Sequence, residues 1–165
     1  MKISTARFGD VEVPRDKLIT MERPILGFES LKRFCLVEVE ELKPFLWLQS
    51  TDQTKVAFLV VNPAVICPDY RIEINSNEIA ELQVSNAESV ETYVIVTIPD
   101  DPRRMSVNLQ GPVLINSENN RAKQLVLVNS GYEVQQSVLE MLDRHGVDLH
   151  AETPTDATEE ELVPA

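Results

Sequence analysis

The chain has 165 residues, and 27 acidic residues against 15 basic ones give it a formal net charge of −12 at pH 7. This length suits one compact domain with its own core and is short for two. The acidic balance argues against direct nucleic-acid binding, because phosphates would be repelled, and favours a basic protein partner; acidity that only maintains solubility is an equal alternative.

Neither a membrane span nor an export signal is predicted. The longest uninterrupted apolar run, Val56–Val61, is far shorter than the roughly 20 residues that a spanning helix needs. The N-terminal residues Met1–Arg7 contain no apolar stretch of the kind found in signal peptides. We therefore expect a cytoplasmic protein.

Short β-type runs recur along the chain with turn residues between them, and prolines stand at the ends of many runs, where a missing N–H costs least. This spacing predicts a mainly β fold, a small antiparallel β pseudo-barrel or sandwich with one or two short helices. The predicted strands are Arg7–Val13, Arg33–Val39, Phe45–Ser50, Lys55–Val61, Arg71–Ile74, Glu91–Ile98, Met105–Leu109, Val113–Ile115 and Leu125–Val128.

Two patterns bear on how these strands are buried. In Arg33–Val39 the residues alternate, so that Cys35 faces one side and Phe34 the other. The run Val56–Val61 is apolar throughout, which indicates burial on both faces. A closed or nearly closed sheet provides such positions.

The stretch from Asn108 to Gln124 predicts a β-hairpin. Its two strands would be Val113–Ile115 and Leu125–Val128, and the polar segment Asn116–Gln124 between them would be the loop.

Helix is scarce in this sequence. A capping box at Asn75–Glu78, followed by Ile79, Leu82 and Val84, predicts a helix of one or two turns. A second capping box at Ser130–Glu133 predicts a longer amphipathic helix that ends at Gly146.

The C-terminus differs in composition from the rest. Residues Ala151–Ala165 contain five acids and no bases, and they cannot bury enough apolar surface to offset their chain entropy. We expect a single β-barrel domain at 1–146 and an acidic, disordered tail at 147–165.

The sequence shows no recognisable catalytic apparatus, since it lacks a Gly-x-Ser-x-Gly elbow and a glycine cluster that could hold a phosphate. His145 and His150 are five residues apart, so a solvated helix end is favoured over a metal pair. Cys35 and Cys67 lie in apolar surroundings, which favours buried free thiols over a disulfide. We expect no enzymatic activity, cofactor or metal.

Five segments in the same order resemble the family of FliW flagellar assembly factors. The resemblance runs from about Phe8 to Tyr132, and the family's proline is displaced upstream in the first segment. The segments are Gly27–Glu29, Pro44–Ser50, Pro68–Tyr70, Ile95–Pro99 and Asn108–Asn116 followed by Gln124.

The resemblance implies a small antiparallel β pseudo-barrel without enzymatic activity, and a monomer when free. It also implies two protein partners, newly made flagellin and CsrA, an RNA-binding translational repressor. Bound to CsrA, such a protein would keep it off the flagellin message, so that flagellin synthesis follows flagellar assembly. An acidic barrel beside the RNA groove of CsrA would attract that basic protein and repel phosphate. The helical ends of flagellin would in addition require an apolar groove.

Candidate contact residues lie in two places. Asp69 and Tyr70 follow Pro68 in a loop, where an exposed polar and aromatic pair is often used for binding; packing of Tyr70 is an equal alternative. Glu78 and Glu81 are expected on the exposed side of the first helix, as part of an acidic face.

Other residues of the matching segments are expected to shape the domain. Trp47 is favoured as a packed side chain over a stacking platform. Asn108 and Asn116 are favoured as hydrogen-bond partners of turns over partner contacts. This structural group consists of Gly27, Phe28, Trp47, Pro68, Asn108, Pro112 and Asn116.

Two alternative functions remain open at this point. A small β-barrel that binds RNA or another oligonucleotide is the principal one, although the net charge and the 5% aromatic content argue against it. A small-molecule or metal enzyme is the other.

Overall fold

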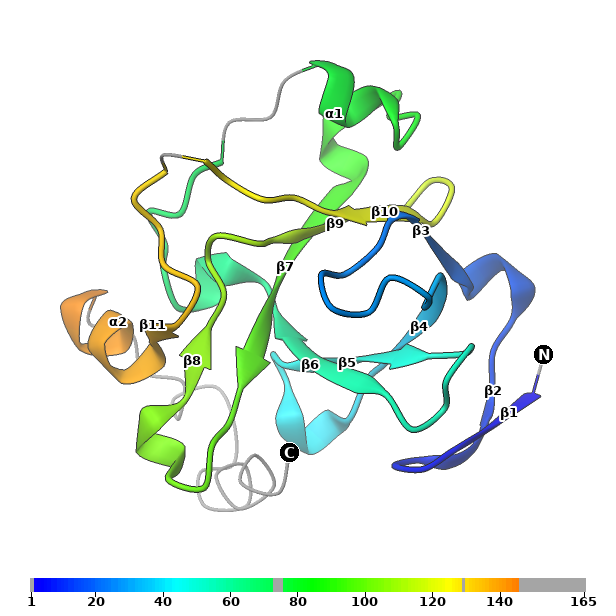
Figure 1. Ribbon diagram of the computed structural model, residues 1–165, viewed down its shortest axis with the longest axis horizontal. Coiled ribbons are helices and arrows are strands. Elements are labelled where there is room, and N and C mark those ends of the chain that lie inside the picture. The colour runs from blue at the N-terminus through cyan, green and yellow to red at the C-terminus, as the bar shows by residue number, and fades with distance from the viewer. Residues whose placement is uncertain (1, 73–75, 129, 146–165) are drawn as a thin grey trace.

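The computed structural model describes residues 2–72, 76–128 and 130–145, and its strands surround a central space (Figure 1). The two α-helices among these residues are α1 (Ser76–Ala80) and α2 (Val138–His145). The strands are β1 (Lys2–Thr5), β2 (Gly9–Glu12), β3 (Ile19–Arg23), β4 (Arg33–Val37), β5 (Leu46–Ser50), β6 (Ala57–Val61), β7 (Val90–Thr97), β8 (Ser106–Val107), β9 (Val113–Asn116), β10 (Arg121–Gln124) and β11 (Gln136–Ser137).

Seven strands close into a barrel in the order β7, β6, β5, β4, β3, β10 and β9, because β9 pairs back to β7. Neighbours in the ring are antiparallel except β10 and β3, which are parallel and shift register between Ala122 and Lys123. Strand β8 pairs with β7 and carries β11, while β1 and β2 form a separate hairpin. The expectation of a mainly β barrel with few helices is confirmed.

The core has two layers because the ring strands bury both faces. The lumen cluster lies inside the ring and includes Phe34, Leu48 and Val60. The outer cluster lies between the ring and the segments that cover it, and it includes Trp47 and Leu59 from the same two strands as Leu48 and Val60. This arrangement explains the uninterrupted apolar run at 56–61, as expected of a closed sheet.

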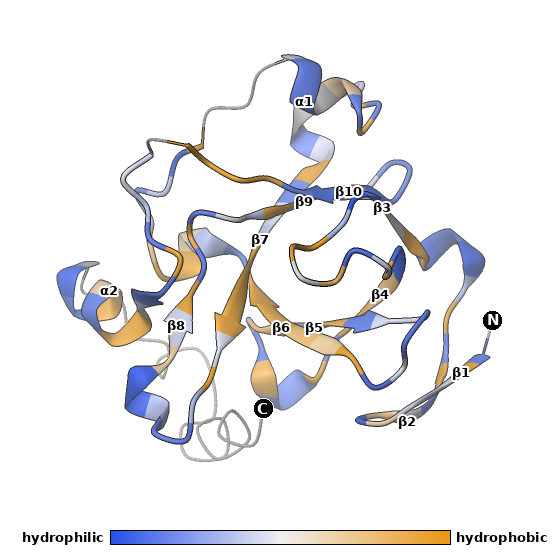
Figure 2. Ribbon diagram, viewed as in Figure 1, coloured by the Kyte–Doolittle hydropathy of each residue, from blue (hydrophilic) through white to orange (hydrophobic). Residues whose placement is uncertain are grey.

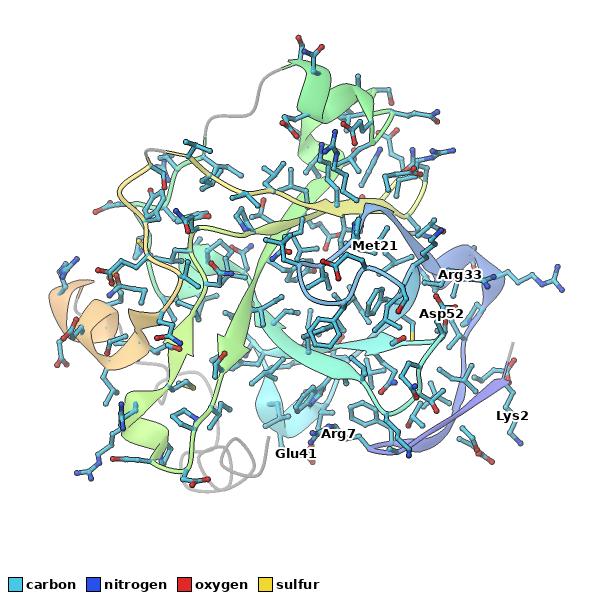
Figure 3. All side chains as sticks on the ribbon, in the orientation of Figure 1. Lys2, Arg7, Met21, Arg33, Glu41 and Asp52 are labelled. Carbon is cyan, nitrogen blue, oxygen red and sulfur yellow. The ribbon has the colours of Figure 1, made fainter. Side chains whose placement is uncertain are left out.

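The loop between β3 and β4, Pro24–Lys32, lies across one opening of the barrel (Figure 1). We call it the plug loop, since Ile25 and Leu31 are buried in the lumen cluster. Met21 of β3 points into the same space (Figure 3). Arg33, the first residue of β4, has its Nε 3.4 Å from Asp52 Oδ1 in the β5–β6 turn.

The hairpin around Gly111 is present, but its second strand was predicted at the wrong residues. Strand β9 pairs with β10 at Arg121–Gln124, which we expected to be loop, and no strand is formed at Leu125–Val128. The polar residues of β10 enter the sheet because they have partners: the buried Lys123 has carboxylates, and Gln124 has backbone groups.

Strands β1 and β3 were missed, and Arg7–Val13 is not one strand, since β2 begins only at Gly9. Arg71 and Ile72 lie outside any strand, and Glu73 and Ile74 lie outside the described residues.

Helix α1 lies where a capping box predicts it. Helix α2 begins eight residues after the predicted start at Ser130, because Gln136 and Ser137 first pair with β8. The Ser137 hydroxyl then accepts a hydrogen bond from the Glu140 amide at 3.3 Å, so the cap that starts this helix is Ser137.

Cys35 and Cys67 are buried free thiols, as expected. No helix within the described residues is both long enough and apolar enough to cross a bilayer. The predicted tail at 147–165 lies outside the described residues.

Candidate protein-binding surfaces

Tyr70 is a packing residue of its loop. Its side chain is 8% exposed, and its hydroxyl donates to the Leu109 carbonyl at 2.7 Å. Its ring lies 4.6 Å from that of Tyr132, whose hydroxyl accepts from the Arg71 amide at 2.9 Å. Burial raises the pKa of the Tyr70 hydroxyl, so it remains a proton donor at neutral pH.

Pro68 and Asp69 are exposed at the tip of the same loop, and Tyr70 anchors the loop to the barrel. A partner that met this loop would therefore touch Pro68 and Asp69 before Tyr70. Tyr132 was missed as part of this unit, and a lone aromatic residue after Gly131 gives no signal that it stacks on residue 70.

Glu78 and Glu81 are bound to cations of the barrel wall. Lys123 of β10 is fully buried, and its Nζ lies 2.5 Å from Glu78 Oε2 and 3.5 Å from Glu81 Oε2. Arg23 of β3 donates twice to Glu81, from Nε at 2.8 Å and from Nη2 at 2.7 Å. We call these four residues the α1 ion cluster. Their formal charges cancel, so α1 contributes less to an acidic face than its sequence suggests.

The hydrogen bonds from Arg23, followed by the charge of Lys123, lower the pKa of Glu81 to about 2. Both cations lie on barrel strands, more than 35 residues from α1 in sequence. Sequence reasoning could see the carboxylates of α1 but not the cations that face them.

Asn108 and its neighbours form a structural network at the start of the hairpin. The Asn108 side-chain oxygen accepts from the amides of Gln110 and Gly111 at 3.1 and 2.9 Å. Gln124 donates to the Gly111 carbonyl at 2.9 Å and accepts from the Leu26 amide of the plug loop at 2.8 Å. Pro112 is buried beside them. The turn role expected of Asn108 is supported by these bonds.

Asn116 holds the other end of the hairpin. Its side-chain oxygen accepts from the Ser89 hydroxyl at 2.8 Å and from the Glu118 amide at 3.0 Å. Its side-chain nitrogen donates to the Leu82 carbonyl at 3.0 Å, which ties the segment after α1 to the barrel. The Asn116 side chain therefore joins three chain segments within the fold.

Gly27 and Phe28 form the exposed tip of the plug loop. Gly27 has a φ of +89°, a backbone conformation that residues other than glycine rarely adopt. Phe28 is 38% exposed, and its ring packs edge-on against Phe58 at 4.9 Å.

Trp47 is packed in the outer cluster. It is 4% exposed, the Phe8 ring meets its edge at 6.0 Å, and the Arg7 guanidinium lies 4.1 Å from its ring centroid. Arg7, at the tip of the β1–β2 hairpin, thus covers the indole from outside (Figure 3).

A recess of about 590 Å³ opens beside the Tyr70 loop, and sequence reasoning missed it. Its lining includes Pro44, Leu46 and two polar side chains of β7, Glu91 and Tyr93. The Tyr93 hydroxyl donates to Glu91 Oε2 at 2.6 Å. Within the described part of the chain, no three His, Cys, Asp or Glu side chains are grouped to hold a metal ion.

Comparison with known proteins gives a consistent result. The FliW protein family matches residues 2–138 of the chain. The flagellar assembly factor FliW of Thermoanaerobacter pseudethanolicus is 41% identical over 143 residues, which are 86% of this chain and 95% of that protein. The flagellar assembly factor FliW of Syntrophus aciditrophicus is 37% identical over 158 residues, which are 93% of this chain and all of that protein.

The fold agrees with the sequence comparison. The crystal structure of a flagellar assembly factor FliW superposes with a TM-score of 0.78 at 32% identity, covering 84% of this chain and 96% of that one. The family match covers most of the chain, including every strand of the barrel. The chain therefore belongs to the FliW family of flagellar assembly factors.

Proposed function

We propose that this protein is a non-enzymatic regulator of flagellar assembly that binds flagellin and the translational repressor CsrA. In this proposal the protein acts in the cytoplasm and is a monomer when free. Bound to CsrA, it keeps the repressor off flagellin mRNA, and flagellin competes for it, so that flagellin synthesis follows assembly. The observation that carries the proposal is the FliW match over residues 2–138.

The charge of the chain supports a basic protein partner. A net charge of −12 attracts the basic surface that an RNA-binding repressor carries, and it disfavours RNA itself. The side chains of Asn108, Asn116 and Gln124 make hydrogen bonds within the fold, which favours a structural role over a catalytic one for these residues.

Direct binding measurements test the proposal. The purified chain is titrated by calorimetry with flagellin, with CsrA and with a flagellin leader RNA, and the CsrA complex is then titrated with flagellin. We expect binding to both proteins, no binding to RNA alone, and release of CsrA by flagellin. If the chain bound RNA and neither protein, it would instead belong to the class of small nucleic-acid-binding β-barrels.

We propose that Asp69 contributes to the CsrA contact, because it is exposed at the tip of a loop that Tyr70 anchors. Glu78 and Glu81 would contribute less, since Lys123 and Arg23 offset their charge. Asp69→Lys is expected to weaken CsrA binding by about 3–10-fold, while the matched change Asp100→Lys on the β7–β8 connection leaves it unchanged. Equal effects of the two substitutions would show that only net charge matters.

A further inference from the structure

We propose that the chain segment directly after β10 binds an extended segment of a partner protein as an added β-strand. The segment is Leu125–Val128, and we call its unpaired side the open edge. The inference rests on the proposed function, and it adds where and in which conformation flagellin is held.

From Leu125 to Leu127 the segment continues the pairing of β10, and one of its sides is bonded to the barrel. The amides of Leu125 and Leu127 donate to the carbonyls of Pro112 and Gln110, each at 2.8 Å, and both leucine side chains are buried. Successive residues of an extended chain direct their backbone groups to opposite sides. The N–H and C=O groups of Val126 therefore point away from the 110–112 segment, and the chain bends at Val128.

The open edge exists because the neighbouring strand stops early. In the barrel, β3 pairs with β10 on this side, and the last paired residues are Arg23 and Lys123. Pro24 then follows, which has no N–H, and the chain leaves as the plug loop. Among the described residues, neither Val126 nor Val128 makes a hydrogen bond through its backbone.

The open edge lacks the features that usually protect an exposed strand. Proteins guard such edges with lysine, proline or a bulge, whereas residues 124–128 read Gln-Leu-Val-Leu-Val. Val126 is 55% exposed and Val128 is 77% exposed. Leu26, 62% exposed, lies at the start of the segment, where its amide meets the Gln124 side chain. Figure 2 shows this hydrophobic stretch leaving the hydrophilic β10.

These properties define the chemistry of the occupant. Unpaired main-chain donors and acceptors call for a strand whose own backbone is free, and exposed valines call for apolar side chains on one of its faces. An exposed carboxylate lies near the start of the segment, on Glu29 beside Gly27 of the plug loop. It favours lysine or arginine flanking the apolar residues.

Of the two proposed partners, flagellin is the one that the proposed function has bound before it assembles, when part of its main chain would still be free to pair. The open edge is therefore assigned to flagellin. This mode differs from a flagellin helix lying in an apolar groove.

Amide hydrogen exchange of the full chain, with and without flagellin, tests the strand directly. On binding, the amide of Val126 is expected to exchange at least about 10-fold more slowly, because it gains a hydrogen bond. A helix lying in a groove would leave that amide exchanging as in the free protein, and this result would overturn the inference.

Substitution separates backbone pairing from simple apolar contact. Val126→Pro removes an N–H that has no partner in the described fold, and it is expected to weaken flagellin binding about 10-fold. The control Leu139→Lys changes an exposed apolar residue of α2 and is expected to leave binding within about twofold. Thermal unfolding of each variant checks the fold, and the exchange experiment on the unaltered chain stands if Val126→Pro does not fold.

Other outcomes are equally decisive. If flagellin does not bind the unaltered chain, both the proposed function and this inference fail. If flagellin binds and only the exchange result is negative, the inference alone fails. A dimer seen by light scattering and abolished by Val126→Pro would give the edge to a second copy of this chain and overturn the assignment to flagellin.

Discussion

At the scale of single residues, Lys123 shows how burial decides which partner of an ion pair matters more for stability. Its side chain is fully buried, whereas the Glu78 side chain is 38% exposed. A carboxylate that loses its partner at this site can be hydrated, but the ammonium group cannot.

We therefore predict that Glu78→Gln destabilises the fold more than Lys123→Met does. Glu78→Gln leaves the buried ammonium with Glu81 at 3.5 Å and is expected to lower the free energy of unfolding by about 1–3 kcal/mol. Urea unfolding of both variants measures the order. As a control, Lys43→Met removes only solvent-exposed ion pairs and should leave the midpoint unchanged. The reverse order of the first two variants would contradict the prediction.

Position 111 favours glycine because there is no room for a side chain, whereas position 27 favours glycine because of its backbone conformation. A Cβ at residue 111 would lie 2.8 Å from Asn108 Nδ2 and 2.9 Å from Gln124 Nε2. Gly111→Ala is expected to destabilise the protein by about 1–3 kcal/mol through this overlap. In denaturant unfolding, the double substitution Asn108→Ala, Gly111→Ala should cost less than the sum of the single ones, because the first removes an atom that the second meets. Strict additivity would argue against the overlap.

At the scale of elements, the α1 ion cluster makes the attachment of α1 dependent on pH. Hydrogen bonds from Arg23 lower the pKa of Glu81 to about 2, from 4.5 for the ordinary group. A folded-state pKa below the unfolded one adds stability that is complete above about pH 4.5 and is lost as the pH falls toward 2.

We predict that Glu81→Gln flattens the pH dependence of stability in this window. Between pH 5 and 2.5, the unfolding midpoint of the unaltered chain should fall more than that of Glu81→Gln. Glu118→Gln provides a control of the same charge change, on a residue hydrogen-bonded to Ser85 and not to a cation. If Glu118→Gln flattened the profile to the same extent, the effect would not belong to the ion cluster.

The elements also show what the sequence could predict. Strands β4 to β7 were predicted because their apolar residues alternate or run uninterrupted, and these patterns follow directly from burial on one or both faces. Strand β10 was not predicted, since Arg121–Gln124 contains only one apolar residue, Ala122. The burial of its Lys123 and Gln124 depends on Glu78 and Gly111, which lie more than ten residues away in the sequence. Helix α2 was placed too early because Ser130–Glu133 and Ser137–Glu140 carry the same capping pattern, and only pairing with β8 selects the second.

For the candidate contact residues too, roles set by nearby sequence could be predicted and roles set by distant residues could not. Side chains satisfied by their own turn, such as Asn108, could be assigned a structural role from local sequence. The partners of Tyr70 and Glu81, namely Leu109, Tyr132 and Arg23, come from elsewhere in the chain, and no periodicity indicates them.

At the scale of the whole molecule, the net charge of −12 predicts how fast CsrA binds. If long-range attraction steers the basic repressor to this surface, the association rate should fall steeply between about 50 and 500 mM salt, while the dissociation rate changes little. Stopped-flow fluorescence gives both rates. Flagellin, if held by main-chain pairing at the open edge, should show a weaker salt dependence. An association rate for CsrA that does not respond to salt would contradict electrostatic steering.

The parallel pairing of β10 with β3 also determines at what point in synthesis the barrel can close. Thr20 pairs with Arg121, so the barrel closes across about 100 residues of chain, and contacts of such long range form slowly. During synthesis β3 has no partner on that side until Arg121 has emerged from the ribosome. The open edge begins at Leu125, directly after the closing strand, so the surface proposed to receive flagellin and the closed barrel are completed in the same step. A nascent chain that ends before β10 would instead present β3 and β9 as two unpaired edges, which makes it prone to aggregate and unable to act.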